Sequence, residues 1–393
     1  MRYRSDHLYD LAVVGAGPAG SLTAALAAAA GLSVVLLEKC KLPRQKTCGG
    51  LISARALALL PAEMPLPEEV DFIRAVRVHS RGRTFTYRET ASAALGAVVR
   101  RAQFDLQMAR YAAACGAELI EEAPLTGLQH AAQAANGAVR AAPPYRLTLG
   151  GSGRERELLA HCVVGADGAQ GRCAGLAGLR GKNRPGPAGW ALAAVTQVEA
   201  PGPESDTACF YPLPLRGGLG WRFPGRGWVN CGAGGLVKPA RLKQELHRLF
   251  PDLSRSQPAA AWPLPFTGPL RTAARDNLLL VGDAAGLVDP FSGEGIYNAL
   301  QSARLAAAAL RIAHRENKPA GPIYSRLFRE HFRGGFFSSL TGAVLLHALS
   351  AAAPAALPPR IAAIMRNTHW YKRDLREQIT AQEPAMAPDN TEL

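Results

Sequence analysis

Residues 15–20 form a glycine-rich turn, GAGPAG, that matches the pattern G-x-G-x-x-G. It stands between an apolar segment at 8–14 and an alanine-rich segment that ends at Gly31, which predicts a strand before it and a helix after it. In that setting the glycines allow a tight turn, close approach of the backbone to a pyrophosphate and close packing of helix on strand. The helix N-terminus adds partial positive charge for the phosphates. The residues predicted to contact a bound dinucleotide here are Gly15, Gly17, Pro18, Ala19 and Gly20.

An acidic residue follows the turn at the distance that dinucleotide sites use. Glu38 lies 18 positions beyond Gly20 (38 − 20), at the end of a second apolar segment, residues 33–39. A carboxylate there accepts hydrogen bonds from the hydroxyls of an adenosine ribose. The segments together predict a strand–helix–strand unit.

Two later segments decide between a nicotinamide and a flavin. Residues 278–286, LLLVGDAAG, place Asp283 at the end of an apolar strand, where its carboxylate can bind a ribityl hydroxyl that nicotinamide dinucleotides lack. Residues 290–296, PFSGEGI, begin a helix whose N-terminus can face the N1–C2 edge of a flavin and stabilise its anionic reduced form. The sequence therefore predicts FAD, with contacts from Gly282, Asp283, Pro290, Gly293, Gly295 and Ile296.

The composition fits a folded, basic protein. Among 393 residues, 48% are hydrophobic and 19% are charged, a balance that excludes disorder for most of the chain. Lys and Arg number 45 against 31 Asp and Glu, a net charge of +14, and 37 of the 45 are Arg. The excess of arginine has two possible origins. A GC-rich genome encodes Arg and Ala often, or the protein surface binds phosphates or anionic lipid. No nucleic-acid partner is expected, since the sequence lacks zinc-finger spacing and basic helical runs.

The cysteines and the N-terminus indicate a reducing compartment. The seven cysteines are odd in number and contain no C-x-x-C pair, so neither a disulfide framework nor a metal site is expected. The charged start MRYRSDH leads straight into an apolar strand rather than a signal peptide. We therefore expect a cytoplasmic protein, with peripheral contact at the inner face of the membrane as a second option.

A segment near the C-terminus carries no charge. Residues 334–359 contain no Asp, Glu, Lys or Arg across 26 positions. A membrane-crossing helix needs about 20 mostly apolar residues, but this segment is dominated by Ala and contains serines, a histidine and Pro354. It is interpreted as a helical cap over a lipophilic pocket or as a monotopic membrane contact.

The order of the elements predicts an α/β fold in which one domain interrupts another. Residues 186–235 change to short alternating apolar runs, which indicate an antiparallel or mixed sheet. We expect a discontinuous Rossmann-like FAD-binding domain at 1–75, 100–182 and 275–330, a substrate domain at 76–99 and 183–274, and a C-terminal helical region at 331–393.

Several motifs together resemble the FAD fold of the p-hydroxybenzoate hydroxylase superfamily. They are GAGPAG with its downstream Glu, the turn GADG at 165–168, and GDAAG followed by GEGI. Two further segments resemble the geranylgeranyl reductase family. PRQKTCGG at 43–50 is similar to its P-R-x-K-x-C-G-G, and WRFP at 221–224 with NCGAG at 230–234 is similar to its Y-x-W-x-F-P and N-x-G-x-G.

The resemblance implies that reduced FAD passes a hydride to a carbon–carbon double bond of a prenyl chain carried by a lipid, a diphosphate or a quinone. Cys48, Gly49 and Gly50 then lie beside the flavin ring, and the proton comes from Cys48 or from water, unless Cys48 only shapes the pocket. Trp221 and Phe223 either form an apolar wall for the hydrocarbon or pack in the core. The implied catalytic residues are Cys48, Trp221 and Phe223.

The resemblance also implies further contacts to the cofactor. Arg44 and Lys46 have the charge to bind the FAD pyrophosphate or a substrate phosphate, with ordinary surface charge as the alternative. Arg101 stands at a helix start where relatives place an arginine against the cofactor, with an exposed, solvated helix face as the alternative. The residues implied in this way are Arg44, Lys46, Cys48, Gly49, Gly50, Arg101 and Asp167.

Three positions depart from the family pattern. Leu219 replaces the tyrosine of Y-x-W-x-F-P, and Gly171 and Ala174 replace the serine and arginine that usually follow GADG. No second G-x-G-x-x-G follows a strand, so the sequence contains no separate nicotinamide-binding domain. The candidate electron donors are NAD(P)H and a ferredoxin. The alternative functions are an FAD-dependent monooxygenase or halogenase, and a flavin-binding electron-transfer module without a substrate of its own.

Overall fold

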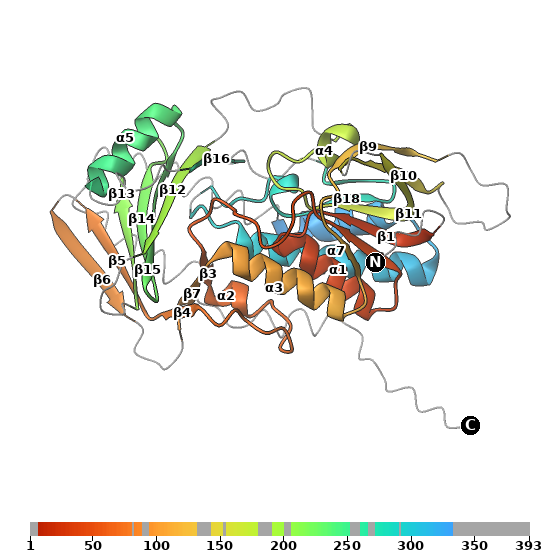
Figure 1. The fold of residues 1–393 in the computed structure, drawn as a ribbon, viewed down its shortest axis with the longest axis horizontal. Coiled ribbons are helices and arrows are strands. Elements are labelled where there is room, and N and C mark those ends of the chain that lie inside the picture. Colours follow the sequence, from red (N-terminus) through yellow and green to blue (C-terminus); the bar gives the residue numbers. More distant parts are fainter. Residues whose placement is uncertain are drawn as a thin grey trace.

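The computed structural model places a sheet covered by helices beside a second, separate sheet (Figure 1). It describes residues 7–80, 82–88, 94–131, 143–151, 155–179, 191–199, 206–251, 260–265, 272–290 and 292–332. The uncharged segment at 334–359, and the expected C-terminal region beyond residue 332, lie outside the described residues.

A sheet with parallel strands at its centre forms the first layer. Its strands are β1 (Leu8–Val14), β2 (Val34–Leu37), β8 (Glu118–Ile120), β9 (Leu125–His130), β10 (Tyr145–Leu149), β11 (Arg156–Gly165), β17 (Ala274–Arg275) and β18 (Leu278–Leu280). The order is β17-β18-β11-β1-β2-β8, and β9 and β10 extend it beside β11. β1 pairs parallel with both β11 and β2, and buried Val and Leu fill these strands, as expected for a sheet covered on both faces.

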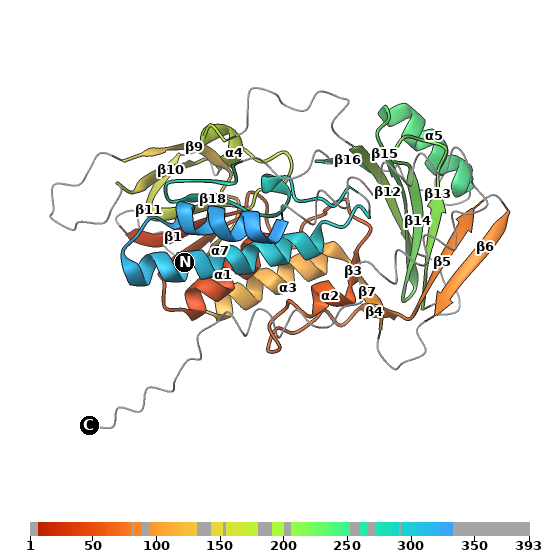
Figure 2. The ribbon, with the colours of Figure 1, turned by 180° about the vertical axis from the view of Figure 1, so that it is seen from behind.

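Helices cover this sheet. They are α1 (Pro18–Ala29), α3 (Arg101–Ala114), α7 (Ile296–Glu316) and a helix over residues 320–332. α1 follows β1 and packs against α3 and α7, and Figures 1 and 2 show the three side by side. The short helices α4 (Cys173–Leu176) and η1 (Gly282–Ala285) follow β11 and β18 at the carboxyl ends of parallel strands, where such sheets bind ligands.

The second sheet is mixed. Its strands, in spatial order, are β16 (Ala260–Leu264), β12 (Ala191–Glu199), β15 (Trp228–Gly235), β14 (Leu219–Gly225), β13 (Thr207–Pro212), β5 (Ala75–Ser80) and β6 (Arg83–Arg88). β13 and β5 are parallel and the other neighbours are antiparallel. α5 (Pro239–Leu249) packs on one face, where Leu242 and Leu246 are buried. The predicted class, a Rossmann-like unit combined with an antiparallel or mixed sheet, is confirmed.

A small third sheet packs between the two layers. It contains β3 (Leu51–Ser53), β7 (Gly96–Val99) and β4 (Val70–Ile73), with α2 (Ala54–Leu57) directly after β3. Ile73 and Val98 pack in one cluster with Phe223 and Trp228 of the second sheet. Ile52, in contrast, packs with side chains of α1, α3 and α7. The small sheet therefore contributes side chains to an apolar cluster on each side of it.

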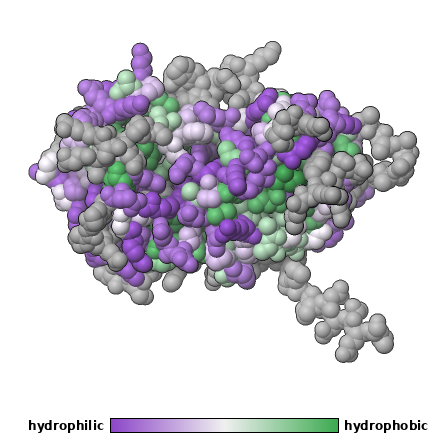
Figure 3. All heavy atoms as spheres, in the orientation of Figure 1, coloured by the Kyte–Doolittle hydropathy of each residue, from purple (hydrophilic) through white to green (hydrophobic). Residues whose placement is uncertain are grey.

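The surface in the view of Figure 3 is mostly hydrophilic, and apolar side chains gather over the alanine-rich helices of the first layer. Within the described ranges, no helix combines the length and the apolarity that crossing a membrane requires. The same ranges contain no group of three His, Cys, Asp or Glu side chains arranged to hold a metal ion.

Candidate active site

A cavity of about 1500 Å³ lies between the first sheet and the second. One side is formed by the glycine turn, the end of β2, the loop at 39–50 and the segment from η1 to the start of α7. The other side is one face of the second sheet. Every residue that the sequence predicted for the site lines this cavity, with the exception of Gly20. The fold thus gathers in one place segments that are far apart in the sequence.

The glycine turn contains two glycines that the fold requires and one that leaves room for a ligand. Gly15 has a φ of +108°, and a Cβ on Gly20 would lie 1.8 Å from the Gly15 carbonyl oxygen. A Cβ on Gly17 would meet only Arg44 Nη2, at 3.7 Å, and the φ of −85° at Gly17 suits any residue. The open space over Gly17, at the N-terminus of α1, fits a pyrophosphate group.

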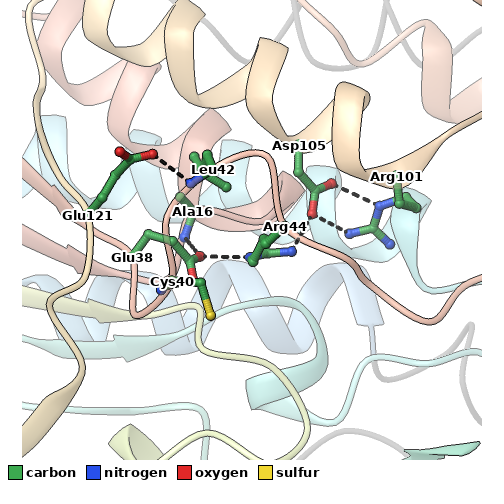
Figure 4. A network of polar contacts seen from close by, with 8 residues as sticks. All are labelled: Ala16, Glu38, Cys40, Leu42, Arg44, Arg101, Asp105 and Glu121. Carbon is green, nitrogen blue, oxygen red and sulfur yellow. Dashed lines mark hydrogen bonds and ion pairs between the residues drawn. The ribbon is translucent and has the colours of Figure 1, made fainter. Parts of the chain in front are cut away.

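Glu38 is fixed at the end of β2, close to the turn (Figure 4). It is 2% exposed, and its Oε2 accepts a hydrogen bond from Ala16 N at 3.1 Å and pairs with Arg44 Nε at 3.1 Å. Its other oxygen, Oε1, accepts from Cys40 N at 3.2 Å. This carboxylate stands where a dinucleotide site of this type binds the adenosine ribose.

A second buried carboxylate, which the sequence did not reveal, holds two arginines of the site. Asp105 of α3 is fully buried and accepts from Arg44 Nη1 at 3.0 Å and from Arg101 Nε and Nη2 at 2.8 and 2.9 Å (Figure 4). Burial disfavours the charge of Arg101, but Asp105 and the adjacent Cys48 side chain outweigh this and raise the pKa of Arg101. Asp105 therefore holds both arginines in place, and Arg44 Nη2 faces the turn at Gly17.

Asn230 of β15 connects the loop at 39–50 to the second sheet. It is fully buried, its Nδ2 donates to the Cys48 carbonyl oxygen at 2.9 Å, and its Oδ1 accepts from Trp221 Nε1 at 2.9 Å. The loop and the sheet approach so closely that a Cβ on Gly49 would lie 2.9 Å from the Phe223 ring. Asn230 belongs to a motif noted in the sequence, but its part in the site depends on the strand register.

Replacing Asn230 by Leu is expected to lower the free energy of unfolding by about 2 kcal/mol. Trp221 Nε1 and the Cys48 carbonyl oxygen lose their hydrogen-bond partner, and Leu cannot replace it at this buried position. Urea unfolding followed by tryptophan fluorescence measures the loss. Gln244 is the control, since it is exposed and accepts a single hydrogen bond from Arg241. Gln244→Leu should cost less than about 0.5 kcal/mol, and equal losses in the two variants would contradict the role of Asn230.

The second sheet presents an apolar wall to the cavity. Phe210 of β13 lies opposite Trp221 of β14, and Trp221 lies opposite Gly232 of β15. A Cβ on Gly232 would lie 2.0 Å from the indole, so the Trp221 ring occupies the space that this glycine leaves. The residues of the wall that line the cavity are Val78, Ala193, Val195, Phe210, Leu219, Trp221, Phe223, Trp262 and Leu264.

The segment before α7 is anchored by a nearly buried carboxylate that the sequence did not identify. Glu294 accepts a hydrogen bond from Ser53 Oγ and forms an ion pair with Arg55. Asp283 lies close to the start of the helix, because a Cβ on Gly295 would be 3.3 Å from Asp283 Oδ1. The amides at the N-terminus of α7 are therefore held beside the cavity, next to Asp283.

Asp167 combines a structural contact with an open acceptor. Its Oδ2 accepts a hydrogen bond at 2.8 Å from the backbone N of Cys173, the first residue of α4. Its Oδ1 is buried and has no hydrogen-bond partner among the described residues. Since buried acceptors are almost always paired, an unpartnered oxygen in the cavity wall fits a donor group of a bound cofactor.

Residues 9–219 match the family model described as FAD binding domain. Digeranylgeranylglycerophospholipid reductase 1 of Methanopyrus kandleri is 30% identical over 360 residues, which cover 84% of this chain and 88% of that protein. The chain belongs to the geranylgeranyl reductase family of FAD-dependent oxidoreductases. The predicted family and the predicted cofactor, FAD, are confirmed.

Two further proteins are similar to the chain described here. Menaquinone reductase of Mycobacterium tuberculosis is 30% identical over 378 residues, which cover 87% of this chain and 85% of that protein. A solved structure of a geranylgeranyl bacteriochlorophyll reductase-like protein from Thermoplasma acidophilum matches with a TM-score of 0.74, over 95% of this chain and 99% of that one, at 23% identity. At this identity the structural match establishes the shared fold alone.

Proposed function

We propose that this reductase saturates carbon–carbon double bonds of a prenyl chain on a lipid or quinone. The observation that carries the proposal is the cavity, in which a dinucleotide site faces an aromatic, apolar wall. A prenyl chain offers almost only apolar surface, which such a wall can bury. The names of two relatives, a digeranylgeranylglycerophospholipid reductase and a menaquinone reductase, support a substrate of this class.

Residues on the first-sheet side of the cavity have the chemistry to hold FAD. Gly17, Arg44 and the N-terminus of α1 suit the pyrophosphate, Glu38 suits the adenosine ribose, and Asp283 suits the ribityl chain. Bound FAD, in its reduced form, supplies the hydride. The proposed role of Asp105 is indirect, since it fixes Arg44 and Arg101 without lining the cavity itself.

The substrate side positions the double bond. Trp221 and Phe223 stack at an angle of 22° with ring centroids 6.2 Å apart, and both line the cavity. Cys48 reaches the same space from the loop whose backbone Asn230 fixes. We assign Trp221 and Phe223 to the binding of the hydrocarbon and the exclusion of water, and Cys48 to the junction between substrate and cofactor.

We further propose that the electrons come from outside the chain, from NAD(P)H or from a ferredoxin, and that the protein meets its lipid at a membrane surface. A single dinucleotide turn in the sequence supports the first point. A net charge of +14 supports the second, because a basic surface is attracted to anionic lipid.

Anaerobic reduction of the purified flavoprotein, followed by addition of geranylgeranyl lipids, diphosphates and prenylquinones, tests the function. Reappearance of the oxidised flavin absorbance, together with a product heavier by two hydrogens, is the expected result. Trials with NADPH and with reduced ferredoxin as the reductant identify the donor. If no prenyl compound oxidises the flavin and air does so through a hydroperoxide-like species, the protein is a monooxygenase instead.

A further inference from the structure

Lys46 occupies the junction between the cofactor side and the apolar wall of the cavity. Its Nζ lies 4.0 Å from the centroid of the Trp262 ring, on the edge strand β16 of the second sheet. The side chain lines the cavity and forms neither a hydrogen bond nor an ion pair with any described residue. The contact with the ring is therefore the main attachment of this ammonium group, as aromatic faces attract cations.

The charged and titratable groups around Lys46 lie on the cofactor side of the cavity. They are Asp283 of η1, Arg101 and Asp105 of α3, and Cys48 of the same loop. Burial is the largest influence, and it lowers the pKa of Lys46 below the ordinary value of lysine. An ammonium in this situation gives up its proton more readily than an exposed one.

We propose that Lys46 Nζ donates the proton that completes the reduction of the double bond, an inference that rests on the proposed function. An N–H bond at Nζ breaks and a C–H bond forms at one alkene carbon, while the other carbon receives the hydride. Alkene, hydride and proton together give the saturated chain. The neutral amine then regains a proton from water.

Cys48, the other candidate for this proton, is placed to accept rather than to donate. Its Sγ accepts a hydrogen bond from Gly50 N at 3.4 Å. The Arg101 guanidinium, which can only donate, lies near the same side chain, and Cys48 helps to raise the pKa of Arg101. Lys46 Nζ carries only donors and faces the aromatic wall. The two residues therefore have different roles in the cavity.

The first test compares Lys46→Met with Lys46→Arg in single-turnover reduction of a prenyl lipid, with rates expressed per bound flavin. Methionine has a similar length but no acidic proton, whereas arginine keeps the cation and does not release its proton. Both variants should slow the reduction by about 100-fold, the size of a general-acid contribution. Reduction at the wild-type rate by either variant overturns the assignment.

The pH dependence tests the proton itself. Only the ammonium form of Lys46 can donate, so the wild-type rate falls as the pH rises through its pKa, which lies below that of ordinary lysine. The slow rate of Lys46→Arg should be constant over the same range, because guanidinium stays protonated. The same alkaline loss in Lys46→Arg would assign the titration to another group and overturn the proposal.

A binding measurement separates this inference from the proposed function. Tryptophan fluorescence follows titration with a prenyl tertiary amine, which is a cation at neutral pH, and with the prenyl alcohol of the same chain as a neutral control. Without Nζ, the amine can occupy the face of Trp262, so Lys46→Met should bind it about tenfold more tightly than wild type, with no change for the alcohol. Equal amine affinities overturn the position of Nζ. If the wild type reduces no prenyl lipid, the proposed function fails, whereas this titration still decides whether Lys46 reaches the wall.

Discussion

Asp105→Ala should lower the free energy of unfolding by about 3–5 kcal/mol, because it removes the carboxylate from two largely buried arginines. The side chains of Arg44 and Arg101 are 15% and 8% exposed, and Asp105 accepts three of their hydrogen bonds. An arginine cannot lose its charge on burial. Arg44 keeps its ion pair with Glu38, but Arg101 has no second ion-pair partner among the described residues and becomes an unpaired buried cation that destabilises the native state directly. Urea unfolding of the flavin-free protein measures this loss without a contribution from bound cofactor.

Glu245 offers a matched control for this prediction. It is 3% exposed and pairs with Arg241 and Arg248, whose side chains are 50% and 59% exposed. These arginines can turn to water when the carboxylate is removed, so Glu245→Ala should cost about 1 kcal/mol or less. Similar losses in Asp105→Ala and Glu245→Ala would show that the buried network in Figure 4 contributes no more than a surface pair.

The parts of the site that the sequence predicted have local signatures. A glycine turn directly after an apolar strand fixes the backbone within a few residues, so spacing alone placed Gly15, Gly17 and Glu38 in one site. The turn with Asp283 was predictable for the same reason. The loop at 43–50 has no such geometric rule, and only its resemblance to a family motif brought it into the site.

Asp105 and Asn230, which the sequence did not identify as site residues, depend on contacts between distant segments. Arg101 and Asp105 are four positions apart on a helix, a spacing equally typical of an exposed ion pair. Only the fold brings Arg44 to the same carboxylate, from 61 positions away. Asn230 reaches Cys48 across 182 positions, and a shift of one residue in its strand would turn it to the opposite face. Such contacts follow from register and packing, which single-sequence patterns do not specify.

Gly17→Val is expected to separate cofactor binding from folding. The Val side chain would fill the open space over the N-terminus of α1, where the pyrophosphate fits, so the Kd for FAD should rise by at least about 100-fold. Because a Cβ at this position meets only Arg44 Nη2, at 3.7 Å, the free energy of unfolding of the flavin-free protein should change by less than about 1 kcal/mol. Flavin fluorescence titration and urea unfolding measure the two quantities.

Valine substitutions at two further glycines serve as controls for this prediction. Gly175 lies outside the cavity with no atom within 4 Å of its would-be Cβ, so Gly175→Val should bind FAD as the wild type does. Gly20→Val should fail to fold stably, because its Cβ would lie 1.8 Å from the Gly15 carbonyl oxygen. Stoichiometric FAD in Gly17→Val would mean that the pyrophosphate does not cross this turn. Loss of FAD with unchanged stability would assign Gly17 to the cofactor and Gly20 to the packing of α1 on β1, although both belong to one six-residue motif.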